Sequence, residues 1–156
     1  MNNAEAIIGK FYTAFANRDS SIMNSCYAED ISFYDPVFEL LRGDEVRYMW
    51  QMLCANAKDL EVTSGSITDL GDGYFTCDWT ATYIFSMTGK KVVNHVRANM
   101  KIEGNQIIEH SDGFSLHKWS AQAFGLTGKL LGWNGVFQRR IKNTAKKNLL
   151  RYMDQN

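Results

Sequence analysis

Three residues of this sequence combine a titratable side chain with apolar neighbours: Asp35, His110 and Asp112. Asp35 stands between Tyr34 and the run Pro36-Val37-Phe38, and such a setting raises the pKa of a carboxyl group toward that of a usable general base. A second interpretation is local, because an aspartate directly before proline favours a turn in which its side chain accepts hydrogen bonds from its own backbone. The sequence leaves both interpretations open.

His110 and Asp112 are two residues apart in a segment that alternates apolar and polar side chains. Because strand residues alternate between two faces, both share the face of Phe114 and Leu116 on this predicted strand. If that face points into the core, the imidazole and the carboxyl group enter the core together and need hydrogen-bond partners. They either serve chemistry in a pocket or satisfy each other structurally.

Large apolar side chains fall on the predicted faces around these residues. Trp79, Tyr83 and Phe85 keep a period of two, and the next strand places Met100 on its more apolar face. Each aromatic residue alone is typical of an ordinary core. Together with two acidic residues they predict a pocket for an apolar small-molecule ligand. The predicted walls are Trp50, Trp79, Tyr83, Met100 and Phe114.

Motifs for cofactors and metals are missing from the sequence. Gly71 and Gly73 lack the third glycine of a dinucleotide fingerprint, and no G-K-[ST] follows, so no nucleotide cofactor is expected. The histidines show no metal-ligand spacing, which predicts no metal site. The three cysteines form no C-x-x-C pair and are expected to be reduced and buried: Cys26, Cys54 and Cys77.

The composition is that of one globular domain. With 156 residues, 45% of them hydrophobic and 13% aromatic, the chain can bury one core. Its formal charge of zero does not suggest a nucleic-acid binder, which is normally basic. Polar residues come before the first apolar ones, so we expect no signal peptide and a cytoplasmic protein.

Periodicity predicts three helices and then a run of strands. The helices are expected near 4–17, from Ser20 or Ser21 through Tyr27, and from Gly43-Asp44 onward, with an extended stretch over 31–36. Strands are predicted near 60–70, 73–87, 90–103 and 106–116, separated by glycine-containing turns. This order predicts an α+β class in which a curved, mostly antiparallel sheet packs on three N-terminal helices.

The segment 7–37, ending in Tyr34-Asp35-Pro36-Val37, resembles the opening of bacterial ketosteroid isomerases without a gap. Those enzymes belong to the nuclear transport factor 2-like superfamily, whose SnoaL-like members are similar to residues 1–116. The resemblance implies a cone-shaped sheet around an apolar pocket, a homodimer, and Asp35 as a proton-shuttling general base. Our hypothesis is a proton transfer of the isomerase or lyase type, with Asp35 as the base and His110 or Asp112 assisting. Phe11 and Ala98 stand where the isomerases carry oxyanion donors, so steroid isomerisation is not expected.

Residues 117–156 form a glycine-interrupted apolar segment and a basic amphipathic helix, predicted to pack on or extend the same domain. Residues 1–112 hold 9 Lys+Arg and 16 Asp+Glu, a net charge of −7, whereas residues 113–156 hold 8 Lys+Arg and one acid, a net charge of +7. The zero net charge is therefore a cancellation between an acidic domain and a basic tail.

Two placements of this tail follow from its charge. The helix packs across the mouth of the cone and pairs with the protein's own acidic surface or a second subunit, which we favour. Alternatively it binds an anionic membrane surface, with four apolar side chains in the interface: Trp119, Phe124, Leu130 and Trp133. The alternative to an enzyme is a non-catalytic, dimeric module that binds a ligand or another protein.

Overall fold

Three helices lie within the first 56 residues in the computed structural model, which describes residues 2–156, and two strands separate the third helix from the second. The helices are α1 (Asn3–Ala16), α2 (Ser20–Ser25) and α3 (Asp44–Asn56). The start of α1 is fixed by a capping box, because the Asn2 side chain accepts from the Glu5 backbone N–H and the Glu5 side chain accepts from the Asn2 backbone N–H. The apolar stripe of α1 is buried against the sheet: Ile8, Phe11, Tyr12 and Phe15.

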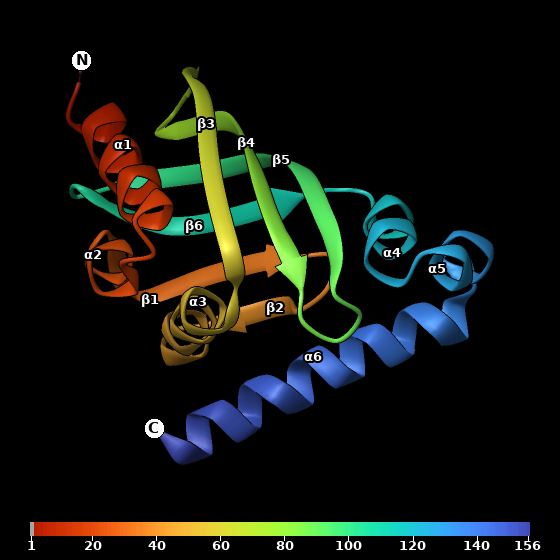
Figure 1. The fold of residues 1–156 in the computed structure, drawn as a ribbon. Coiled ribbons are helices and arrows are strands. Elements are labelled where there is room, and N and C mark those ends of the chain that lie inside the picture. The colour runs from red at the N-terminus through yellow and green to blue at the C-terminus, as the bar shows by residue number, and fades with distance from the viewer. Residues whose placement is uncertain (1) are drawn as a thin grey trace.

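Six strands form one curved sheet in the order β2-β1-β6-β5-β4-β3 (Figure 1). Their bounds are β1 (Tyr27–Asp35), β2 (Glu39–Arg42), β3 (Lys58–Gly71), β4 (Tyr74–Phe85), β5 (Lys90–Glu103) and β6 (Gln106–Gly113). Only the β1–β6 pair is parallel, and register shifts interrupt the β3–β4 ladder, where bulges bend the strands. The predicted α+β class with a mostly antiparallel sheet is confirmed.

Two local predictions were wrong, and one strand was missed. Tyr27 does not end the second helix but begins β1, where it pairs with Ile107 of β6. Leu116 does not continue the last strand, because the Ser115 side chain accepts a hydrogen bond from the Lys118 N–H and starts a helix there. Strand β2 was not predicted, since its four residues are too few to show a period.

The chain after β6 forms three helices: α4 (Leu116–Phe124), α5 (Leu126–Leu131) and α6 (Gly135–Gln155). Gly128 allows α5 to cross α4 closely, because a Cβ at this position would overlap the Ser120 carbonyl. Helix α6 then runs back past the β4–β5 hairpin to α3 (Figure 1). Within residues 2–156, no helix has the length and apolar character needed to cross a membrane.

The basic helix α6 is held to the rest of the protein by its apolar stripe and by ion pairs. Leu149 is buried in the main core, and Ala145 and Tyr152 pack against it. Arg139 and Lys142 both reach Glu39, at 2.9 and 3.8 Å. The tail therefore packs on the acidic part of the same chain.

Candidate active site

Asp35 occupies the end of β1, where it is 9% exposed. Its Oδ1 accepts hydrogen bonds from the backbone N–H groups of Val37 (2.8 Å) and Phe38 (2.6 Å), an arrangement that requires the turn set up by Pro36. The predicted turn is present, and this turn aspartate also lines the large cavity of the protein. Within residues 2–156, every hydrogen bond to the Asp35 carboxyl group reaches Oδ1, and Oδ2 has no bonded partner.

The environment of Asp35 disfavours its charge. The pKa of this carboxyl group is raised from its ordinary 3.8 to about 7, mainly because the group is buried and to a smaller extent because the charge of Asp112 lies nearby. The N–H groups of Phe38 and Val37 and the nearby His110 lower the pKa and offset part of this effect. Near neutral pH, Asp35 is therefore poised to take up or release a proton.

Asp112 ends a chain of buried hydrogen bonds that begins on α3. The Trp50 Nε1–H donates to the Tyr27 hydroxyl (2.9 Å), which lies 2.8 Å from His110 Nδ1, and His110 Nε2 lies 2.9 Å from Asp112 Oδ1. A carboxylate oxygen can only accept, so His110 donates to Asp112 Oδ1 from Nε2, and in the neutral imidazole Nδ1 then accepts from the Tyr27 hydroxyl. Asp112 Oδ1 also accepts from the Trp79 Nε1–H at 3.2 Å.

The His110 ring is enclosed by aromatic side chains that fix its position. Phe33 and Phe11 meet it edge to face at 5.1 and 5.5 Å between ring centroids, and Trp50 stacks on it at 6.2 Å. His110 is 2% exposed and does not line the cavity. Its structural role is therefore to orient Asp112, which does line it.

The cavity has a volume of about 610 Å³ and opens between the sheet, α3 and α6. Asp35 and Asp112 are the acidic members of its lining, and most of the remaining members are apolar or aromatic. Tyr83 also belongs to the wall, and its hydroxyl accepts a hydrogen bond from the Trp119 Nε1–H at 2.8 Å. Two buried carboxyl groups thus face a mainly apolar chamber, which is the arrangement of a binding or catalytic pocket.

A comparison with known protein families identifies the family of this chain. The model of the SnoaL-like domain family matches residues 8–110. The chain belongs to this family. The match begins in α1 and ends at His110 in β6. It therefore includes most of the N-terminal helices and of the sheet, with Asp35, and stops before α4, α5 and α6. No curated protein matches the sequence.

Solved structures share the fold of this SnoaL-like domain. A hypothetical protein with a ketosteroid isomerase-like fold from Catenulispora acidiphila, in complex with trimethylamine, superposes with a TM-score of 0.66 at 15% identity, over 76% of this chain and 92% of its own. TerC, co-crystallised with polyporic acid, superposes with a TM-score of 0.68 at 10% identity, over 80% of this chain and 100% of its own. An LEH-like epoxide hydrolase of M. tuberculosis superposes with a TM-score of 0.66 at 16% identity, over 83% of this chain and 96% of its own. These similarities establish the cone-shaped fold.

Most of the residues expected to form a pocket in the SnoaL-like domain do gather around the cavity. Trp50, Trp79, Tyr83 and Phe114 line it together with the two aspartates. Met100 does not, because its side chain is 2% exposed and lies in the core. Two groups were missed. The first is Tyr27, which was assigned to a helix although it is buried and odd-numbered like residues 31, 33 and 35 of the same strand. The second is the set of cavity-lining residues on α6, which could not be predicted because they depend on where that helix packs.

The predicted oxyanion positions carry no polar group. Phe11 is fully buried against Tyr27 and His110, and Ala98 lies opposite Asp112 on β5. Within residues 2–156, no three side chains of His, Cys, Asp or Glu gather in an arrangement suited to a metal ion. The polar groups that line this SnoaL-like cavity include the carboxyl groups of Asp35 and Asp112 and the Tyr83 hydroxyl on the sheet, and further polar side chains on α6.

Proposed function

We propose that this protein binds an apolar small molecule in its cavity and catalyses a proton transfer on it, as an isomerase or lyase that needs no cofactor. The observation that carries this proposal is the pair of aspartates in the cavity wall. Each is held through Oδ1 by protein donors, and each has an Oδ2 without a bonded partner in residues 2–156. Fixed carboxyl groups in an apolar chamber suit general acid–base chemistry.

Asp35 is the proposed base. Its carboxylate, once ionised, is more basic than that of an ordinary aspartate because it is buried, and it can remove a proton from a carbon next to a carbonyl group. Asp112 is the proposed assisting group, and His110 positions it from behind. The Tyr83 hydroxyl, which already accepts from Trp119, has its own proton to donate to a substrate oxygen.

A carbon acid that needs no special recognition tests this assignment. In 5-nitrobenzisoxazole, a base takes the proton from C3, the C–H electron pair completes a C≡N bond, and the N–O bond breaks to release a coloured phenolate. We expect the wild type to accelerate this reaction, with a rate that rises with pH through about 7 as Asp35 ionises. Asp35→Asn keeps an acceptor for the Val37 and Phe38 N–H groups and is expected to remove the acceleration.

Two controls decide how a result is interpreted. Asp78→Asn removes an exposed carboxyl group on the outer face of β4 and is expected to leave the rate unchanged. Binding of the neutral dye N-phenyl-1-naphthylamine, followed by fluorescence, checks that Asp35→Asn keeps its cavity. Equal acceleration by wild type and Asp35→Asn would exclude Asp35 as the base, and dye binding without acceleration would favour the non-catalytic ligand-binding module.

A second candidate function is peripheral membrane binding by the tail. Trp119 and Phe124 are packed against the protein and are not available, but four apolar side chains at the α5–α6 junction are exposed beside Lys129: Leu126, Leu130, Trp133 and Val136. Apolar side chains flanked by cations suit the surface of an anionic bilayer. Cosedimentation with phosphatidylserine vesicles, lost at high salt and in Trp133→Ser, is the expected result, and no cosedimentation at low salt would exclude it.

The predicted homodimer belongs to the same proposal. The outer face of the sheet is uncovered by helices and carries exposed residues such as Asp78, His95 and Arg97. We place a second copy there, and sedimentation velocity at micromolar concentration measures it. A single species at the mass of one chain would contradict it.

A further inference from the structure

The four charged residues of the cavity lining are separated by element. The two acids come from the sheet, Asp35 at the end of β1 and Asp112 in β6, whereas the two bases, Arg140 and Arg151, come from α6. Both arginines are exposed, on the helix that forms one wall of the cavity. The cavity thus has acidic groups on its sheet wall and basic groups on its α6 wall.

The two arginines lie on one stripe of α6. They are 11 residues apart, which corresponds to about three turns and about 16 Å along a helix. The stripe between them is polar and lines the cavity beside the apolar stripe of the same helix: Thr144 and Asn148. A ligand that touches α6 therefore meets an apolar surface with a cationic, hydrogen-bonding edge.

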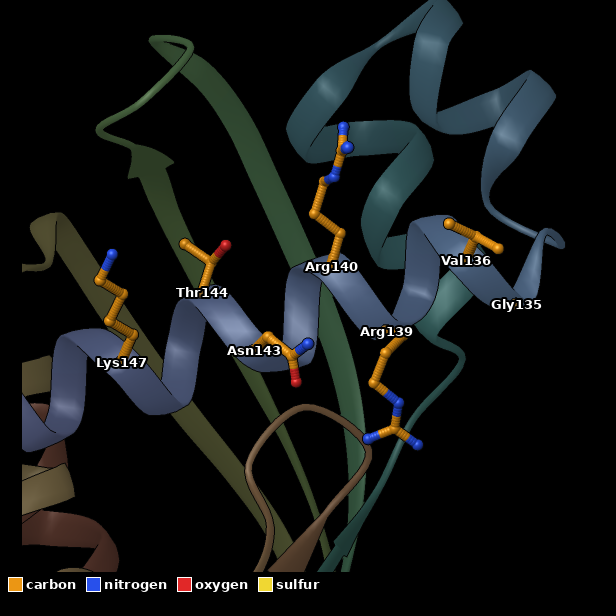
Figure 2. Close-up of a pocket in the computed structure, with 7 residues that line it drawn as sticks. All are labelled: Gly135, Val136, Arg139, Arg140, Asn143, Thr144 and Lys147. Carbon is orange, nitrogen blue, oxygen red and sulfur yellow. The ribbon is translucent and has the colours of Figure 1, made fainter.

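Arg140 and Arg151 differ from the cations that hold α6 in place. Arg139 and Lys142 pair with Glu39, whereas within residues 2–156 neither Arg140 nor Arg151 has an ion-pair partner. Figure 2 shows Arg139 and Arg140 leaving α6 on opposite sides of the helix. An unpaired guanidinium group beside a cavity is available to a carboxylate, sulfonate or phosphate of a ligand.

A second hollow lies beside this edge of the cavity. It has a volume of about 480 Å³ and shares Arg140 and Thr144 with the cavity. Lys147 also lines it, on the same side of α6 as Arg140 and Thr144 (Figure 2). The net charge of +7 on residues 113–156 places this second hollow in a positive region of the surface.

We infer that the substrate is an amphipathic anion, whose apolar part fills the cavity and whose anionic group stays at α6 beside Arg140 and Arg151. This inference rests on the proposed function and adds the chemical class of the substrate. The charge arrangement also sets its orientation, because an anionic group is repelled by the aspartates on the sheet wall and attracted by the arginines. The reacting carbon therefore belongs to the apolar part, at a distance from the anionic group.

Two dyes with the same ring system test the inference. 1-Anilinonaphthalene-8-sulfonate carries a sulfonate, and N-phenyl-1-naphthylamine is the same skeleton without it. We expect the wild type to bind the sulfonate dye more tightly in low salt, by about tenfold if both exposed arginines contribute. The variant Arg140→Gln/Arg151→Gln is expected to lose this preference and to bind the neutral dye as the wild type does.

The matched control is Lys129→Gln/Lys146→Gln, which removes the same charge from the basic tail at two exposed positions that line neither the cavity nor the second hollow and form no ion pair within residues 2–156. It is expected to keep the preference for the sulfonate dye. An equal loss in both double variants, or a wild type without any preference, would overturn the inference while leaving the proposed function in place. Binding of neither dye to the wild type would overturn the cavity as a ligand site, and with it the proposed function.

Discussion

Replacing Asp35 with asparagine should change how the stability of the protein depends on pH. Below the ordinary pKa of 3.8, the carboxyl group is protonated in both the folded and unfolded chain, and it behaves much as an asparagine. Between 3.8 and about 7 the unfolded chain releases this proton while the folded protein keeps it, so folding stability decreases as pH rises. Above about 7 the folded protein holds a buried charge at full cost.

The size of the effect follows from the difference in pKa. Each pKa unit corresponds to about 1.4 kcal/mol, so a shift from 3.8 to about 7 gives an upper estimate of about 4 kcal/mol. The asparagine Oδ1 can still accept from Val37 and Phe38, so these two hydrogen bonds do not contribute to the difference. Asp35→Asn is therefore expected to gain up to about 4 kcal/mol over the wild type at pH 8.5 and little at pH 4.

Urea unfolding followed by tryptophan fluorescence, at intervals from pH 4 to pH 8.5, measures both proteins. Asp78→Asn is the control, and its stability relative to the wild type should change with pH in the opposite direction. The reason is that the hydrogen bond with Arg97 lowers the pKa of this exposed carboxyl group. A stability difference between wild type and Asp35→Asn that stays constant across this range would refute the burial argument and remove the basis for Asp35 as a base near neutral pH.

Two further substitutions test the packing of the site. Tyr27→Phe leaves His110 Nδ1 and the Trp50 N–H unpaired in the core and should destabilise the protein by about 1–3 kcal/mol in urea unfolding. Tyr34→Phe on the same strand is exposed and should have almost no effect, and equal effects of the two would argue against the buried chain. Leu149→Ala on α6 should cost about 2–5 kcal/mol and the exposed neighbour Leu150→Ala under about 0.5 kcal/mol. An equally small loss for both would mean that α6 does not pack on the core.

Periodicity was sufficient for much of the fold and for several site residues. The alternating phases of β4, β5 and β6 directed Trp79, His110 and Asp112 inward, and all three are buried. Side chains that alternate over many residues report which face is buried, whatever the neighbouring strand is. The boundary errors at Tyr27 and Leu116 arose where a single capping or pairing contact ends an element, and such contacts leave no period.

The sequence by itself determined the class of fold, the inward faces of the strands, and the separation of an acidic domain from a basic tail, because composition and spacing are properties of the chain. Only the tertiary structure decided that Tyr27 and Trp50 hold His110 and that α6 brings two arginines to the same cavity as Asp35. These contacts join residues far apart along the chain, and their positions depend on how whole elements pack. Neither spacing nor residue type records that packing.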